Sequence, residues 1–304
     1  MNYIDKCVYG NQTREKGIVM RATTPRVSVL TPIYNTNPTH LRECIESVLA
    51  QTFTDFEFLI LNDSPDNMEI ERIVKEYAGR DKRIKYFKND KNMGITPSRN
   101  KLLDMARGEY IATFDHDDIS VPNRLELQVA FLDTHADIGV VSGLMEYFGE
   151  KNYIRGYPEY DADIKMWMTD NCSVSHTASM IRKSVLDENN IRYEPYFSPG
   201  EDYRLFARLM EHTLFYNMQI PLVRYRFFAG QTTHTQAAKM ARAHDEIQLA
   251  FINKFPAYYE KYQRYISPRT VFRFSLFGII PLFKVKHNWV LLFNIIPVFK
   301  LRWR

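Results

Sequence analysis

The sequence predicts an α/β protein with a mostly parallel sheet and helices on both faces. Three observations lead to this prediction. Short apolar runs recur between residues 26 and 143, and most are followed by a stretch with helical spacing of its apolar residues. These stretches are long enough for the crossover that joins two parallel strands. Several of the runs are apolar almost throughout, as in strands that are buried on both faces.

The elements are expected in regular alternation. Strands are expected at 27–31, 56–62, 84–87, 109–114 and 138–143, and helices at 39–51, 67–79, 97–107 and 122–134. Pro122 marks the start of the last of these helices, because proline is favoured in the first turn. Beyond residue 150 the pattern is less regular, and we expect shorter strands, with a helix at 202–212 introduced by "SPGED".

The composition is that of an ordinary globular protein and excludes several classes. The chain has 304 residues, of which 45% are hydrophobic and 25% charged, so a well-buried core is expected. Cys7, Cys44 and Cys172 are widely spaced and odd in number, which indicates neither a disulfide framework nor a zinc site. The N-terminus has no apolar signal region, and no apolar run reaches the ~18 residues that span a bilayer. A cytoplasmic location is therefore expected.

The charge is divided unevenly along the chain. Residues 261–304 hold nine Lys or Arg and no Asp or Glu. The whole chain has a net charge of +4, so residues 1–260 carry a net charge of −5. "LFGIIPLFKVK" and "LFNIIPVFKLR" nearly repeat within this basic tail, which also holds Trp289 and Trp303. We expect an amphipathic helical tail that contacts an anionic membrane surface, while a helical pair packed on the body is the alternative. An acidic body with its basic residues confined to the tail argues against nucleic-acid binding.

Three carboxylates crowd the end of the fourth expected strand. "YIATFDHDD" places Asp115, Asp117 and Asp118 within four residues. One of them could cap a helix, but a divalent cation explains the group better, because Mg²⁺ is held by one or two carboxylates together with substrate phosphates. His116 would point away from Asp115 and Asp117 if the segment stayed extended. Neither a P-loop nor a GxGxxG motif occurs, so an NTPase and a dinucleotide enzyme are not indicated.

At this point several motifs together resemble bacterial family 2 glycosyltransferases. "VSVLTPIYNTNPTHLRECIESVLAQTFTDFEFLILNDSPD" is similar to the opening of that family, and "NMGITPSRNKLLDMARGEYIATFDHDD" is similar to the part that ends in its DxD motif. "SPGEDYRLFARL" and "YRFFAGQTT" match later segments, so the resemblance covers roughly residues 26–235. It implies a Rossmann-like GT-A fold.

The resemblance also implies roles for individual residues. Donor-binding positions are Pro32, Tyr34, Asn35, Asp63, Arg99, Asp115 and His234; the metal positions are Asp115 and Asp117; the catalytic base is Asp202, with Glu201 beside it. Without the resemblance, helix capping would be the simpler interpretation of Asp202. His176 is a further candidate contact to donor or acceptor. Asn62 stands where the family has an acid, and Phe228 where it often has a histidine, for which His234 is the candidate substitute.

The sequence therefore predicts an inverting, Mn²⁺- or Mg²⁺-dependent glycosyltransferase. We expect it to move a sugar from a UDP-sugar to a hydroxyl of a lipid-linked oligosaccharide or lipopolysaccharide at the cytoplasmic face of the inner membrane. The expected division is a lead-in at 1–25, a nucleotide-sugar half at 26–143, an acceptor half at 144–260 and the tail at 261–304. A nucleotidyltransferase and a non-catalytic membrane-bound partner with a degenerate site are the alternatives. Nothing in the sequence indicates the donor sugar, the linkage or the oligomeric state.

Overall fold

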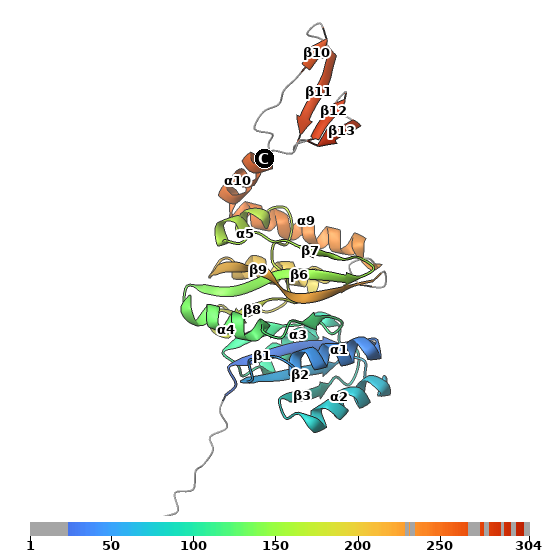
Figure 1. The fold of residues 1–304 in the computed structure, drawn as a ribbon. Coiled ribbons are helices and arrows are strands. Elements are labelled where there is room, and N and C mark those ends of the chain that lie inside the picture. Colours follow the sequence, from blue (N-terminus) through green and yellow to red (C-terminus); the bar gives the residue numbers. More distant parts are fainter. Residues whose placement is uncertain are drawn as a thin grey trace, which may run out of the picture.

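The computed structural model describes residues 24–228, 231 and 235–266, together with the backbone of four short strands nearer the C-terminus. The expected lead-in before residue 24, His234 and Trp303 lie outside the described residues. Figure 1 shows the described body as layers of helices and sheet, with β1 to β3 toward one end and β6, β7 and β9 toward the other.

The main sheet is mixed but contains the parallel core that the sequence predicts. Its order is β3-β2-β1-β4-β8-β6-β9-β5, with β7 on β6. Pairs β2–β3, β1–β2, β1–β4 and β6–β9 are parallel, whereas β8 is antiparallel to both β4 and β6. The strands are β1 (Val27–Ile33), β2 (Phe56–Asn62), β3 (Ile84–Lys88), β4 (Tyr110–Thr113), β5 (Ile119–Ser120), β6 (Ile138–Gly149), β7 (Tyr153–Arg155), β8 (Met180–Arg182) and β9 (Leu214–Phe227).

Helices cover both faces of this sheet. They are α1 (Pro38–Leu49), α2 (Met68–Arg80), α3 (Ile95–Met105), α4 (Arg124–Thr134), α5 (Asp161–Trp167), α6 (Lys183–Glu188), α7 (Glu201–Leu209), α9 (Ala237–Lys254) and α10 (Pro256–Ile266), with a 3-10 turn at Pro195–Phe197. The structure thus confirms the predicted α/β fold class. The fourth helix begins at Arg124 rather than at Pro122, and Asn123 is its N-cap residue.

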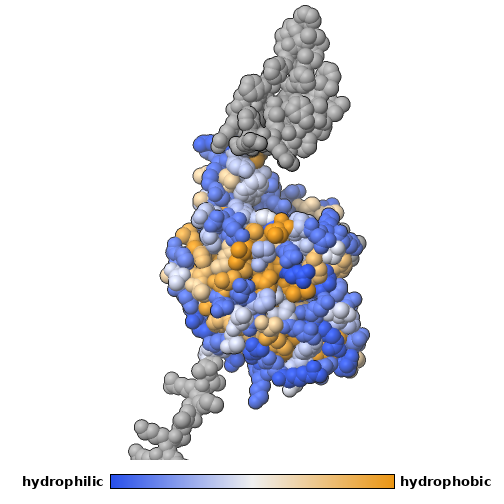
Figure 2. Space-filling view, viewed as in Figure 1, coloured by the Kyte–Doolittle hydropathy of each residue, from blue (hydrophilic) through white to orange (hydrophobic). Residues whose placement is uncertain are grey.

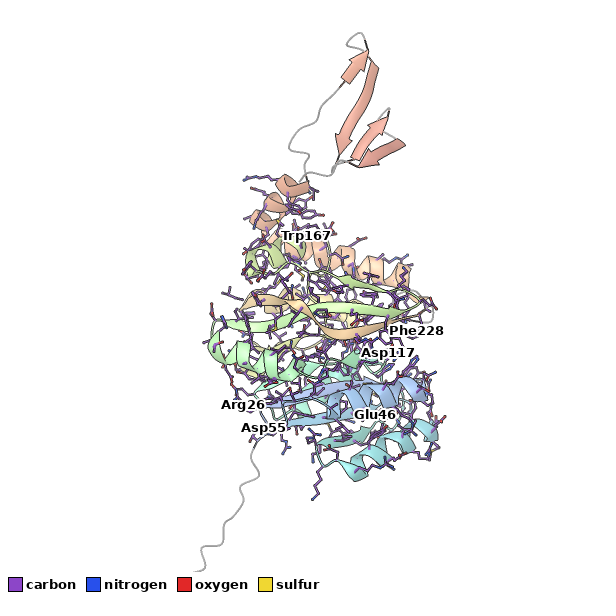
Figure 3. All side chains as sticks on the ribbon, viewed as in Figure 1. Arg26, Glu46, Asp55, Asp117, Trp167 and Phe228 are labelled. Carbon is purple, nitrogen blue, oxygen red and sulfur yellow. The ribbon has the colours of Figure 1, made fainter. Side chains whose placement is uncertain are left out.

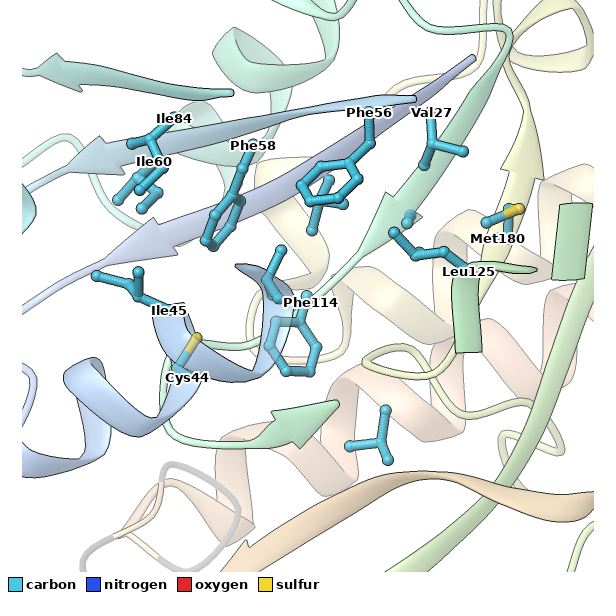
Figure 4. Close-up of a cluster of buried hydrophobic side chains, with 14 of the residues drawn as sticks. Val27, Cys44, Ile45, Phe56, Phe58, Ile60, Ile84, Phe114, Leu125 and Met180 are labelled. Carbon is cyan, nitrogen blue, oxygen red and sulfur yellow. The ribbon is translucent and has the colours of Figure 1, made fainter. Parts of the chain in front are cut away.

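Two hydrophobic clusters, one on each face, hold the helices to the sheet. α1, α2 and α4 pack on one face through side chains that include Ile45, Ile73 and Leu125. In the same cluster lie Phe56 and Phe58 of β2 and Phe114, which follows β4 (Figure 4). α3, α5, α7 and α9 pack on the opposite face. β1 has no exposed residue, which explains its almost unbroken apolar sequence. Apolar side chains also reach the surface among hydrophilic ones in the middle of the visible face (Figure 2), as is usual for globular proteins.

The second half of the chain departs from the expected short strands. β9 has 14 residues and pairs with β6, which has 12, in parallel along most of its length. Register shifts interrupt the pairing near Gly143 and Leu144, and Pro221 lies in β9 at that point. Because proline and irregular pairing break the apolar pattern, the sequence reads as several short segments rather than one strand.

The C-terminal segment differs from the amphipathic helical tail that the sequence led us to expect. After α10 the structure has strands β10 (Phe274–Leu276), β11 (Ile280–Lys286), β12 (Trp289–Leu292) and β13 (Ile296–Lys300), paired antiparallel in that order. Pro281 and Pro297 disfavour a helix interior, and the surrounding Phe, Ile and Val favour strands. None of the described helices is long and apolar enough to cross a membrane.

Candidate functional site

The candidate site lies at the carboxyl ends of β1, β2 and β4, where parallel sheets bind their ligands. Tyr34 follows β1, Asp63 follows β2 and the Asp115–Asp118 turn follows β4. Figure 3 shows Asp117 between the layer of β1 and that of β6, near Phe228. Tyr34 is 50% exposed, so its ring is accessible to a ligand.

The acidic turn is held in place by three contacts from other elements. Arg226 of β9 donates from its backbone N–H to Asp118 Oδ1 (3.0 Å) and from Nε to the Asp117 carbonyl (2.9 Å). The Asp115 N–H donates to Thr177 Oγ1 (3.2 Å). β4 ends at Thr113, so the turn is not an extended continuation of the strand, and the expected alternation of His116 does not apply.

Arg99 joins the acidic turn to the start of α7. Its Nη2 donates to Asp115 Oδ1 (3.0 Å) and its Nη1 to Glu201 Oε1 (2.7 Å). The Arg99 side chain is only 12% exposed and that of Glu201 6%, so this ion pair is largely shielded from water. α3, β4 and the first turn of α7 are therefore fixed to one another by one guanidinium group.

The carboxylates of the turn are not equivalent. Burial alone would raise the pKa of Asp115, but the nearby His176 and the charge of Arg99 outweigh it and hold that pKa below its usual value. Burial raises the pKa of Asp117 and raises that of Asp118 well above its usual value, and the neighbouring carboxylates add to both shifts. Among the described residues, no ion pair is formed by Asp117, and Asp118 Oδ2 is buried without a hydrogen-bond partner. Within the described residues, neither acid lies at ion-pair distance from a cationic side chain.

A divalent cation suits this pair only together with ligands from a substrate. No group of three or more His, Cys, Asp or Glu that could hold a metal occurs in the part of the chain that the structure describes, which does not include His234. Asp115 already accepts from Arg99, which leaves Asp117 as the carboxylate open to a cation. Mg²⁺ and Mn²⁺ sites that rely on phosphate oxygens need no more than one or two carboxylates, so the residues present fit such a cation.

The residues after β1 and β2 shape the turn beside Tyr34. Asn35 adopts a left-handed conformation (φ 44°), and its N–H donates to Ser64 Oγ (3.2 Å). Asn62 Oδ1 accepts from the N–H and the hydroxyl of Ser64, both at 2.9 Å. The amide that replaces the family's acid therefore holds this turn closed. Pro32 lies deeper and lines a small cavity with Arg99, His176 and other residues.

Asp63 accepts hydrogen bonds from residues that the sequence did not indicate as its partners. Its side chain is buried and accepts from Asn89 Nδ2 (2.7 Å) and from the N–H groups of Met93 and Gly94 (2.8 Å each). Gly94 precedes α3, the helix that carries Arg99. Asp63 therefore positions the start of α3 relative to β2.

The first turn of α7 carries two adjacent acids, Glu201 and Asp202, whose side chains have different surroundings. Gly200 is the N-cap and no side chain caps the helix, so the capping interpretation of Asp202 does not apply. Asp202 Oδ1 accepts from the next N–H, that of Tyr203 (2.7 Å), and its side chain is half-buried. Its neighbour Glu201 pairs with Arg99, which places this turn of α7 beside the acidic turn.

His176 was a candidate from the sequence, whereas its partner Tyr193 and also His40 had no recognisable signal there. His176 Nδ1 lies 3.9 Å from Asp115 Oδ1, and its Nε2 hydrogen-bonds to the Tyr193 hydroxyl at 2.8 Å. His40 of α1 packs on the Phe228 ring, with 5.9 Å between ring centroids, and burial and the charge of Arg226 lower its pKa. These contacts join segments far apart in the chain, so no local pattern announces them.

Comparison with known proteins identifies the family. Residues 28–189, more than half of the chain, match the family described as Glycosyl transferase family 2. The chain is 36% identical over 188 residues to an uncharacterized glycosyltransferase of Methanocaldococcus jannaschii, and the match covers 60% of this chain and 64% of that protein. The chain therefore spans slightly less than two thirds of this relative.

Solved structures share the fold. S. aureus TarS 1–349 in complex with UDP-GlcNAc superposes with a TM-score of 0.59 at 20% identity, covering 78% of this chain and 74% of that one. The mannosyltransferase PcManGT from Pyrobaculum calidifontis in complex with GDP-Man and Mn²⁺ has a TM-score of 0.57 at 15% identity, covering 80% and 70%. Because the family model matches more than half of its residues, this chain belongs to glycosyl transferase family 2.

Proposed function

We propose that this glycosyltransferase takes its sugar from a UDP-sugar and transfers it with inversion to an acceptor hydroxyl. The observation that carries the proposal is the bridge from Arg99 to Asp115 and Glu201, which brings the acidic turn and the start of α7 into one site. A donor-binding end and a candidate base are thereby held together although about a hundred residues of chain separate them.

At the donor end, Tyr34 is the proposed platform for the uracil ring, and Asn35 and Pro32 belong to the same wall. Asp117, with Asp115 beside it, would hold Mn²⁺ or Mg²⁺ against the diphosphate. When bound, such a cation neutralises the charge that develops on the departing nucleoside diphosphate. TarS was solved with UDP-GlcNAc and PcManGT with Mn²⁺, and these relatives motivate the choice of nucleotide and metal.

At the acceptor end, Asp202 is the proposed general base. A sugar hydroxyl is a poor nucleophile at neutral pH, and a positioned carboxylate that removes its proton contributes about 10²–10⁴-fold. Asp202 is half-buried and its carboxylate is not ion-paired in the described part of the chain, so it is free to accept that proton. Glu201 is 4% exposed and engaged by Arg99, which makes it a positioning residue rather than a second base.

The proposed acceptor is part of a lipid-linked bacterial surface glycan at the cytoplasmic face of the membrane. The basis is the tail, with nine basic and no acidic residues between 261 and 304. Each Lys or Arg near an anionic leaflet contributes about 1 kcal/mol at most. Full-length protein should therefore sediment with anionic vesicles at low salt and remain in solution with neutral ones. Equal binding to both would remove the electrostatic argument.

Donor hydrolysis in the absence of acceptor tests the core of the proposal. UDP-, GDP- and dTDP-sugars are incubated with the protein, with and without Mn²⁺, and nucleotide release is measured. We expect metal-dependent release of UDP from one sugar, and its loss in Asp117→Asn. Asp104→Asn is the matched control, because Asp104 is 64% exposed and pairs with Arg192 away from the turn. Release of GDP or dTDP instead, or full activity of Asp117→Asn, would overturn the proposal.

A further inference from the structure

A ribbon of three strands, β6, β7 and β9, borders the site and presents two different faces. Residues directly opposite one another in neighbouring strands share a face. Met145 pairs with Arg155, and Tyr147 pairs with both Tyr153 and Tyr225, so these side chains share one face, here called the tyrosine face. Glu146, Phe148 and Arg224 lie on the other face, and Arg226 of that face clamps the acidic turn.

Arg155 on the tyrosine face is a cation with no counter-charge. Its Nη1 donates to the Tyr147 hydroxyl at 3.3 Å, and its guanidinium lies 5.1 Å from the centroid of the Tyr157 ring. It is half-buried, and within residues 24–228, 231 and 235–266 it forms no ion pair with any carboxylate. Aromatic neighbours orient a guanidinium but do not neutralise it. One side of the group therefore remains available to an external anion.

The tyrosine face spans the distance between the acidic turn and the candidate base. At one end the ring of Tyr225 packs on Tyr147, with 4.8 Å between centroids. The next residue, Arg226, donates its backbone N–H to Asp118 Oδ1 (3.0 Å), so this end adjoins the acidic turn.

The other end of the face adjoins α7. Asn217 Nδ2 donates to the carbonyls of Pro158 (2.7 Å) and Ser173 (3.0 Å), and the Tyr203 hydroxyl donates to the Met168 carbonyl. The segment 168–173 therefore links Tyr157, on whose ring Arg155 packs, to the turn of α7 that carries Asp202. An acceptor whose hydroxyl reaches Asp202 would extend along this segment toward Arg155.

We propose that Arg155 binds an anionic group, a carboxylate or a phosphate, on the acceptor. This inference rests on the proposed function, because it assumes that the acceptor hydroxyl lies at Asp202. Arginine binds both anions through paired N–H donors. The enzyme would then select a charged glycan over its neutral counterpart through a contact on the side opposite the donor.

One sugar scaffold with three substituents at C6 provides the test. Methyl β-glucoside is neutral, methyl β-glucuronide carries a carboxylate and methyl β-glucoside 6-phosphate carries a phosphate. Binding of each to the full chain, loaded with UDP and Mn²⁺, is measured by saturation-transfer difference NMR titration. Hydrogen bonds between ionised groups are stronger than those between neutral groups; we therefore expect at least one charged ligand to bind at least about tenfold more tightly than the glucoside. The better of the two identifies the anion.

Two variants separate a specific contact from general attraction. Arg155→Gln should abolish the charge preference. Arg224→Gln is the matched control: Arg224 lies on the same ribbon but on its other face, 3.6 Å from Glu146 and stacked on Phe148, and its loss should leave the preference unchanged. Melting temperatures establish that both variants are folded, and Arg155→Lys, which keeps the charge, should retain part of the preference.

The outcomes are distinct from those that test the function itself. Equal binding of all three ligands to the wild type, including no detectable binding of any, would overturn the inference, as would a preference that survives Arg155→Gln. A weaker affinity of Arg155→Gln for UDP with the charge preference intact would assign Arg155 to the donor instead and also overturn it. Donor hydrolysis by the wild type is measured in parallel; its absence would count against the proposed function, whereas its presence without a charge preference would refute only the role of Arg155.

Discussion

Removal of Arg99 should destabilise the protein far more than removal of an ordinary ion-pairing arginine. Arg99→Met leaves Glu201, whose side chain is 6% exposed, as a buried carboxylate without its cation. Breaking a buried pair in this way costs about 3–5 kcal/mol. A domain of this size loses about 2–4 °C of melting temperature per kcal/mol, so a decrease of roughly 6–20 °C is expected. Urea unfolding followed by tryptophan fluorescence gives the free energy of unfolding directly.

Arg107→Met is the matched control. Arg107 also pairs with a buried glutamate, Glu57, at 2.7 Å, but its own side chain is 57% exposed. After its loss, Glu57 Oε1 still accepts from Ser28 Oγ (2.7 Å) and from the backbone N–H of residue 107 (2.9 Å). The expected loss is therefore only about 1 kcal/mol. The difference in stability between the two variants therefore depends on whether a buried carboxylate is left without a partner, since each variant removes one arginine.

A double mutant isolates the mechanism. If the cost of Arg99→Met comes from the unpaired Glu201 carboxylate, Glu201→Gln in the same chain should recover part of it, with a coupling energy of about 0.5–3 kcal/mol. Additive losses in the double variant, or equal losses for Arg99→Met and Arg107→Met, would refute the reasoning. Either result would mean that water or a neighbouring group solvates Glu201 once the guanidinium is gone.

Three further predictions follow. Gly108→Ala should lower the free energy of unfolding in urea by about 1–3 kcal/mol, because its Cβ would lie 2.5 Å from the Ser28 nitrogen. Gly79→Ala in α2 meets nothing within 4 Å and should raise the free energy of unfolding by about 0.5–1 kcal/mol. Equal effects of the two substitutions would contradict this prediction. Tyr34→Ala should weaken UDP binding in calorimetry about tenfold if the ring stacks on the base, and unchanged affinity would exclude stacking. Asp202→Asn should lower kcat for transfer by about 10²–10⁴-fold at unchanged UDP affinity, and a residual rate above a tenth of wild type would exclude it as the base.

Much of the fold was predictable because its strands are buried on both faces. Strand β2 has the predicted bounds, since "FEFLILN" is a run of mainly apolar residues that ends where the polar turn begins. β8 could not be predicted: it has three residues and takes its place between β4 and β6 only through pairing that is non-local. The C-terminal strands were not predicted, because a basic segment with Trp289 and Trp303 is typical of an amphipathic helix, whereas Pro281 and Pro297 lie inside strands of the structure.

The site was predictable to the extent that its residues lie at strand ends. The strand-end position of Asp115 and Asp117 followed from the cluster after β4 alone, and the structure places both there. The roles of Glu201 and Asp202 did not follow, because neighbouring helical residues differ by about 100° in direction and a sequence does not say which one faces the core. In the structure Glu201 points inward to Arg99, and Asp202 stays half-exposed. A buried cation thus distinguishes two adjacent acids: it engages Glu201 as part of the framework and leaves Asp202 half-exposed, as the proposed base requires.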